Sequence, residues 1–115
     1  PVFSSGVTLA SVSSQLAAHL VIRKLNGEDV DWANEYQQKM MNGVNTFRSY
    51  VMGWYDGTLD IIFFADKQDP LIKNQICSVL AGYVWDENNP YVANHEKALQ
   101  RLARVITLEK AINAN

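Results

Sequence analysis

The chain has 115 residues, 48% of them hydrophobic, which suffices for one small domain or for part of a larger one. Ten basic and twelve acidic residues give a net charge of -2, without the basic stripe of a nucleic-acid-binding surface. The longest apolar run, residues 61–65, is far shorter than the ~20 residues of a membrane span. Cys77 is the only cysteine, which excludes an intrachain disulfide or a cysteine-based metal site. We therefore expect a cytoplasmic protein that binds no nucleic acid, membrane or metal.

Helical periodicity dominates the sequence and predicts an all-α chain of four or five helices without a sheet. The first helix is expected over residues 4–24. Its apolar stripe recurs at helical spacing and comprises Leu9, Val12, Leu16 and Leu20. A second face carries only small residues, namely Ala10, Ser13, Ser14 and Ala17. That face would let the helix lie very close to another backbone or to a flat ligand.

A second helix is predicted from an N-cap at Asp31 to between Met52 and Tyr55. Aromatic and apolar residues fall on one side of it at spacings of three, four or seven: Trp32, Tyr36, Met40, Phe47, Val51 and Trp54. Such a stripe is typical of core packing. Residues 58–65 are compatible with a strand, but a lone strand would have no partner, so we expect a short buried helix there.

Two Pro-containing start signals predict the remaining helices, because Pro fits the first helical position. Asp69-Pro70 opens one, and Asn89-Pro90 opens the last. The apolar face of the first of these is expected to contain Leu71, Ile72, Ile76, Leu80 and Tyr83. The last helix is expected to use Leu99, Leu102, Val105 and Ile106. Cys77 is expected to be a small buried hydrophobe.

The common catalytic motifs are absent, so no catalytic residue is assigned. There is no glycine-rich dinucleotide fingerprint and no phosphate loop. His19 and His95 lie far apart in sequence and are interpreted as boundary residues of amphipathic helices. The charged residues of the last helix are interpreted as a solvated face.

One segment differs from the rest. Residues 1–7 read Pro-Val-Phe-Ser-Ser-Gly-Val and lead directly into the helix with the small-residue face. A Ser-Ser-Gly turn at a helix start leaves several backbone N–H groups without intrahelical partners, at the positive end of the helix dipole. Such a turn can bind an anion or the electron-rich edge of a ring. The alternative is an ordinary helix on which Ser4 is an ordinary N-cap.

This segment resembles the turn of flavin-dependent halogenases that follows their second FAD-contacting motif, where Pro-x-x-Ser-Ser/Thr-Gly-Val/Ile leads into a helix. The aromatic stretch of residues 47–55, Phe63-Phe64 and the helix start at Asp69-Pro70 are also similar to the family's C-terminal region. The resemblance implies that residues 1–115 form a single C-terminal helical domain of an α/β, Rossmann-like FAD enzyme. The FAD-binding sheet domain would lie upstream and is absent from this chain. Because the first residue is Pro1, we also expect a piece of a longer protein.

The resemblance further implies which residues would contact the cofactor: Pro1, Val2, Ser4, Ser5, Gly6 and Val7. The backbone amides of Ser4, Ser5 and Gly6 would lie against the flavin and help to hold a chloride or bromide ion near the ring. The implied partners are a flavin reductase and an aromatic or carrier-bound small-molecule substrate. A homo-oligomer would be one way to bury the exposed small-residue face.

Two departures limit the resemblance. Phe3 stands where the tryptophan-specific branch has a glutamate, which favours the branch that acts on phenols, pyrroles or carrier-bound substrates. The catalytic lysine of the family would lie upstream, and none of this chain's lysines occupies a matching motif. The chain alone is therefore expected to be inactive. Two alternatives stay open: a part of a non-halogenating FAD monooxygenase or reductase, and a stand-alone helical interaction or dimerisation module.

Overall fold

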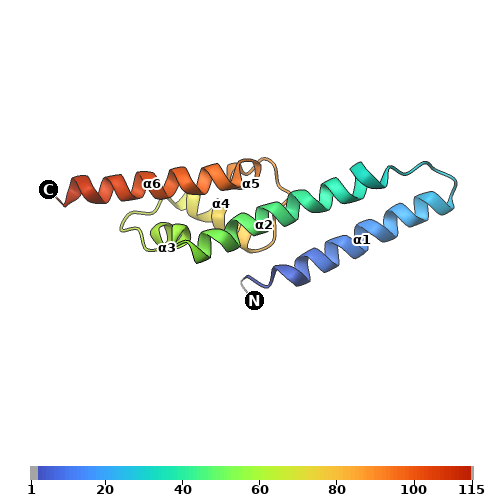
Figure 1. Cartoon of the computed structure of the whole chain (residues 1–115), viewed down its shortest axis with the longest axis horizontal. Helices are drawn as coiled ribbons and strands as arrows, with labels where there is room; N and C mark the ends of the chain where they lie inside the picture. Colours follow the sequence, from blue (N-terminus) through green and yellow to red (C-terminus); the bar gives the residue numbers. More distant parts are fainter. Residues whose placement is uncertain (1–2, 115) are drawn as a thin grey trace. The chain divides into compact units, whose positions relative to one another are not determined.

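A computed structural model describes residues 3–114, and within that range every regular element is a helix (Figure 1). The all-α fold class is thus confirmed. Contacts divide the chain into two compact units, Pro1–Asn45 and Thr46–Asn115, and each is described by itself. The prediction of a single domain stays a prediction.

The first unit contains α1 (Ser5–Leu25), the π-helix η1 (Trp32–Gln38) and the start of α2 (Lys39–Tyr55), which continues into the second unit. Asp31 is the N-cap of η1, as predicted, because its carboxylate accepts a hydrogen bond from the backbone N–H of Asn34 at 3.2 Å. The predicted second helix therefore exists, but its first two turns are π-helical.

Polar contacts join α1 to η1. The hydroxyls of Ser13 and Tyr36 are hydrogen-bonded at 2.7 Å, so part of the predicted small-residue face contacts η1. Near the other end of α1, Arg23 pairs with Glu28 at 2.9 Å and also with Glu35. The guanidinium of Arg23 lowers the pKa of the Glu35 carboxyl, so the pair keeps its charges at neutral pH.

The second unit is built along α6 (His95–Asn113), which contacts α3 (Thr58–Phe63) and α5 (Pro90–Ala93), while α5 contacts α4 (Pro70–Leu80) (Figure 1). Its core is mainly aliphatic, and the innermost side chains include Tyr50, Leu59, Ile76, Val79 and Val84. The Tyr50 hydroxyl donates to the Tyr91 carbonyl at 3.1 Å, which satisfies the one polar atom of that ring.

The local start signals of this unit are confirmed. The Asp69 carboxylate accepts from the N–H groups of Leu71 and Ile72, and Pro70 begins α4. Residues 58–63 form a short helix, as expected, with Leu59 and Ile62 buried. The last helix differs: Pro90 begins only the single turn α5, because Asn94 has non-helical dihedral angles and α6 restarts at His95.

Several expected burial positions are wrong. Cys77 is exposed, because α4 turns the side containing Ile76 and Val79 to the core. Leu71 is 66% exposed, since it lies in the first turn of α4 and away from that side. Tyr83 is 67% exposed because α4 already ends at Leu80.

Outer positions of two other predicted stripes also face solvent. Trp32 and Trp54, at the two ends of the aromatic stripe, are 41% and 45% exposed, while Met40 and Phe47 between them are buried. Val105 of the last helix is half-exposed.

Helix α1 has the predicted length, but it is more apolar as a whole than its short apolar runs suggest. Its most apolar window of 18 residues has a mean hydropathy of 1.3, and only 6% of that window is buried. By length and composition alone, α1 could cross a membrane. The same properties occur in core helices of soluble proteins and in signal sequences, so the expectation of no membrane contact stays a prediction.

Candidate functional site

The backbone that leads into α1 adopts an uncommon conformation. Phe3 has φ 60° and Ser4 has φ 49°, and these are the only non-glycine residues with positive φ among residues 3–114. For a residue with a Cβ atom, the left-handed conformation costs roughly 1–2 kcal/mol. Two consecutive residues of this kind at the start of a helix store strain, and such strain is concentrated at functional sites.

Ser4 does not cap α1 with its side chain. It occupies the N-cap position, yet its hydroxyl makes no capping hydrogen bond, and no acidic residue lies in the first turn. A backbone bond closes the turn, from the N–H of Val7 to the carbonyl of Ser4 at 3.2 Å. The positive end of the helix dipole is therefore not compensated by a side chain of this turn.

The turn has the geometry of an anion-binding concavity. A left-handed residue, Ser4, is followed at once by the right-handed helix from Ser5, and successive N–H groups in such turns form a concave donor surface. Gly6 is exposed, and a Cβ atom added to it would meet nothing within 4 Å. Among the described residues, the backbone at Gly6 is therefore open on the side where a Cβ atom would point.

The predicted cofactor-contacting residues are only partly described. Pro1 and Val2 lie outside the described residues, so their predicted role is untested. Ser4, Ser5, Gly6 and Val7 form one continuous turn, with the Val7 side chain 71% exposed. The sequence did not reveal the left-handed backbone at Phe3 and Ser4, because neither residue type favours it.

A second polar constellation lies in the other unit. The Oγ atom of Ser49 on α2 is 2.7 Å from Nδ1 of His95, the first residue of α6. Burial lowers the pKa of this imidazole below its usual value, although the nearby Glu96 carboxylate opposes that shift. His95 donates no hydrogen bond to a carboxylate in the part of the chain that the structure describes, so we interpret its pairing with Ser49 as a contact that joins two helices.

No candidate metal site is present among residues 3–114, where no three His, Cys, Asp or Glu side chains converge.

No family model matches the chain. Two individual proteins, however, are similar to the chain. A solved structure titled flavoprotein/dehydrogenase, from Cytophaga hutchinsonii, matches 96% of this chain with 51% sequence identity and a TM-score of 0.92. A 1H-pyrrole-2-carbonyl-[peptidyl-carrier protein] chlorinase from Pseudomonas fluorescens is 30% identical over 87 residues, or 74% of this chain. The chain spans 27% of the length of the first protein and 19% of the second.

Proposed function

Since this chain is related to flavin-dependent halogenases and other flavoproteins, we propose that it forms the C-terminal helical part of an FAD-dependent oxidoreductase of the halogenase type. The observation that carries the proposal is the match with the flavoprotein, which extends over nearly the whole chain at 51% identity and a TM-score of 0.92. At that level of similarity the fold and its ligand-contacting turns are normally shared.

We infer further that the turn at Ser4, Ser5 and Gly6 contributes to the flavin site. The residues fit such a role, since the turn offers backbone donors, an uncompensated helix dipole and open space at Gly6. The N–H groups would bind the electron-rich edge of the ring, and α1 would direct its positive end toward the anionic reduced cofactor. When bound, the flavin would supply the redox chemistry; this chain would orient it. We propose more specifically that the same N–H groups help to hold a halide ion beside the flavin. The match with a chlorinase favours this proposal.

The substrate proposed for the whole enzyme is a small aromatic molecule carried on a protein. It is supported by the chlorinase relative, whose name describes a pyrrole carbonyl group attached to a peptidyl-carrier protein. Phe3, in place of an acid, is consistent with that branch. A second candidate, a flavoenzyme that needs no halide, is favoured by the higher identity with a protein titled a dehydrogenase.

The first experiment is to isolate the native protein from its source and to measure its mass and its absorbance between about 350 and 500 nm. We expect a product several times larger than this chain that carries a flavin spectrum. A colourless product of 115 residues that does not respond to added FAD would contradict the proposal. Halide-dependent product formation would then separate the two candidates, because only the halogenase consumes chloride or bromide.

The turn itself is tested by Gly6→Ala in that native protein. The chain has room for the methyl group, so unfolding should be unchanged or up to about 1 kcal/mol less favourable. A bound ring at the same place would clash with the methyl group, and we expect FAD affinity to fall roughly tenfold. Ser4→Gly relieves the strained backbone and keeps every N–H group of the turn, so it should lower FAD affinity less than Gly6→Ala does. Equal FAD affinity in wild type and Gly6→Ala would exclude close contact between the flavin and this turn.

A further inference from the structure

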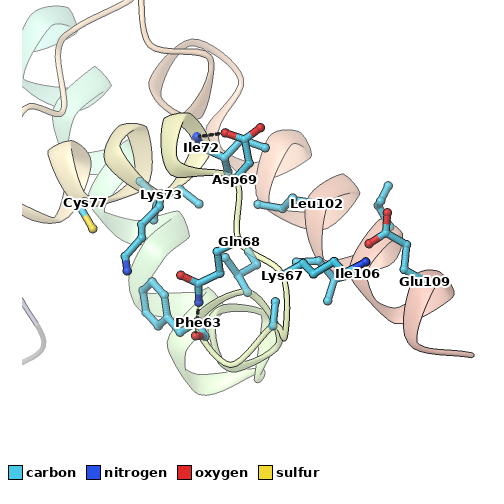
Figure 2. A pocket seen from close by; sticks show the side chains of 14 residues that line it. Phe63, Lys67, Gln68, Asp69, Ile72, Lys73, Cys77, Leu102, Ile106 and Glu109 are labelled. Atoms are coloured by element: carbon cyan, nitrogen blue, oxygen red, sulfur yellow. Dashed lines mark hydrogen bonds between the residues drawn. The ribbon is translucent and has the colours of Figure 1, made fainter. Parts of the chain in front are cut away.

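The second unit contains a cavity of about 460 Å³ between α3, α4, α6 and the loop that precedes α4 (Figure 2). Its volume lies within the usual range of small-molecule sites. The wall is aliphatic and comes from three helices: Ile62, Ile72, Ile76, Leu102, Val105 and Ile106. None of these residues belongs to the turn at Ser4–Gly6, so the cavity is a separate feature of the chain.

The polar groups are gathered at the edge of the cavity. Lys67 comes from the loop and Lys73 from α4, and Figure 2 shows their side chains at different parts of the edge. Neither lysine forms an ion pair with another described residue. Both ammonium groups are therefore available to a ligand.

The two acids at the edge differ in what they already do. The carboxylate of Asp69 accepts hydrogen bonds from the N–H groups of Leu71 and Ile72 at 2.8 and 3.3 Å, so α4 itself uses its charge. Glu109 on α6 forms no ion pair with another described residue and caps no helix. Both carboxylates oppose a bound anion, and Glu109 is the one whose charge can be removed without breaking the N-cap of α4.

We propose that this cavity binds an amphipathic organic anion, with its apolar body against the isoleucine-rich wall and its anionic end beside Lys67 or Lys73. An apolar wall with a few polar groups at the edge is the usual composition of a small-molecule site. The apolar body contributes affinity through burial, and the lysines select the charge of the other end. The proposal does not depend on flavin binding, so each can fail without the other.

The exposed thiol of Cys77 gives a specific readout, because it lines the cavity and is the only cysteine of the chain. The probe is octanoate, and 1-octanol is its neutral control of the same length. We expect octanoate to slow alkylation of Cys77 by N-ethylmaleimide in a saturable way, and 1-octanol to protect at least about threefold more weakly. Equal protection by the two probes, or no saturation with octanoate, would overturn the proposal.

Charge variants test where the anionic end lies. If the carboxylate of octanoate lies beside Lys67, Lys67→Gln should raise its apparent dissociation constant about two- to fivefold, as for a solvent-exposed ion pair. If it lies beside Lys73, Lys73→Gln should have the same effect. Glu109→Gln should lower that constant, since it removes an opposing charge. Lys97→Gln, on the exposed face of α6, is the matched control and should change nothing. The dissociation constant is obtained from the fraction protected, so a changed intrinsic reactivity of Cys77 in Lys73→Gln does not affect it.

A result in which neither Lys67→Gln nor Lys73→Gln differs from Lys97→Gln would also overturn the proposal. All four variants change exposed side chains, and circular dichroism before each titration confirms that the helices are retained. Protection that persists equally in all four would assign the octanoate effect to non-specific surfactant action and reject a built site.

Discussion

His95 joins two helices through a single polar contact. Its Nδ1 atom meets the hydroxyl of Ser49 at 2.7 Å, and the ring is only partly exposed because it begins α6 against α2. Burial favours the neutral imidazole, which is why the pKa of this group lies below its usual value. A proton on this ring therefore costs more in the folded chain than in the unfolded one.

The stability of the chain should accordingly depend on the charge of His95. Because its folded pKa is lowered, the unfolded state binds more protons as pH falls below the unfolded value of ~6.5. The contribution of His95 is thus complete above about pH 7.5 and is lost as pH falls through 6.5 toward the lower folded pKa. Since the ring is partly exposed, we expect a loss below about 1 kcal/mol. Urea unfolding at pH 7.5 and 5.5 measures it.

The matched variants are His95→Asn and His19→Asn. Asparagine can retain a hydrogen bond to Ser49 but does not titrate, so His95→Asn should lose this part of the pH dependence. His19 lies exposed on α1, and His19→Asn is the control for exchanging a histidine for an asparagine elsewhere in the chain. The same pH slope in both variants would show that His95 does not carry it.

At the scale of elements, two asparagines stand at helix starts but differ in the hydrogen bonds that their side chains make. Asn89 is 6% exposed; its side chain accepts from the N–H of Tyr91 at 2.9 Å and donates to the carbonyl of Gln75 at 2.8 Å. It therefore both begins α5 and connects it to α4. Asn94 begins α6 but makes no side-chain capping bond.

Asn89→Ala should destabilise the chain by about 2 kcal/mol, because it removes both a cap and the side-chain hydrogen bond that ties α5 to the Gln75 carbonyl of α4. Asn94→Ala should cost less than about 0.5 kcal/mol, since no side-chain bond is lost. Both variants replace an asparagine at a helix start by alanine. Thermal unfolding compares their losses of stability. Equal losses would mean that the contact with Gln75 contributes nothing.

The same elements show how far the sequence determines the fold. Capping is a local interaction, so Asp31, Asp69 and Asn89 could each be recognised as a helix start from neighbouring residues. Burial is decided by packing between helices, which is why the sequence missed the fully buried Tyr50 and wrongly placed Cys77 in the core. The break at Asn94 could not be foreseen either, since it depends on how α6 packs rather than on a Pro or Gly signal.

The candidate sites follow the same rule. The Ser-Ser-Gly turn was found because its chemistry is contained in adjacent residues, whereas its left-handed backbone at Phe3 and Ser4 was not encoded by residue type. The cavity in the second unit gathers Lys67, Lys73 and Glu109 from a loop and two helices. No linear pattern marks residues so distant in sequence, so only the folded unit reveals them.

At the scale of the whole chain, α1 exposes much of its apolar surface. Val7, Ile22 and Leu25 are 71%, 58% and 80% exposed, and Leu20 is its only buried residue. Large exposed apolar surfaces of this kind usually mark an interface. In the proposed flavoenzyme, the remaining part of the polypeptide would cover α1. The other described elements of its own unit leave this apolar surface exposed, so we expect the isolated chain to bury it by association.

We therefore expect the isolated chain to self-associate through α1. Sedimentation velocity at increasing concentration should show species larger than the monomer. Ile22→Gln combined with Leu25→Gln should raise the dissociation constant at least about tenfold, because burial of two apolar side chains is lost. The pair Leu108→Gln and Ile112→Gln on α6, which are 54% and 74% exposed, is the control and should leave association unchanged. If the chain is monomeric throughout, or if the α6 pair dissociates it equally, then α1 is not the surface that needs a partner.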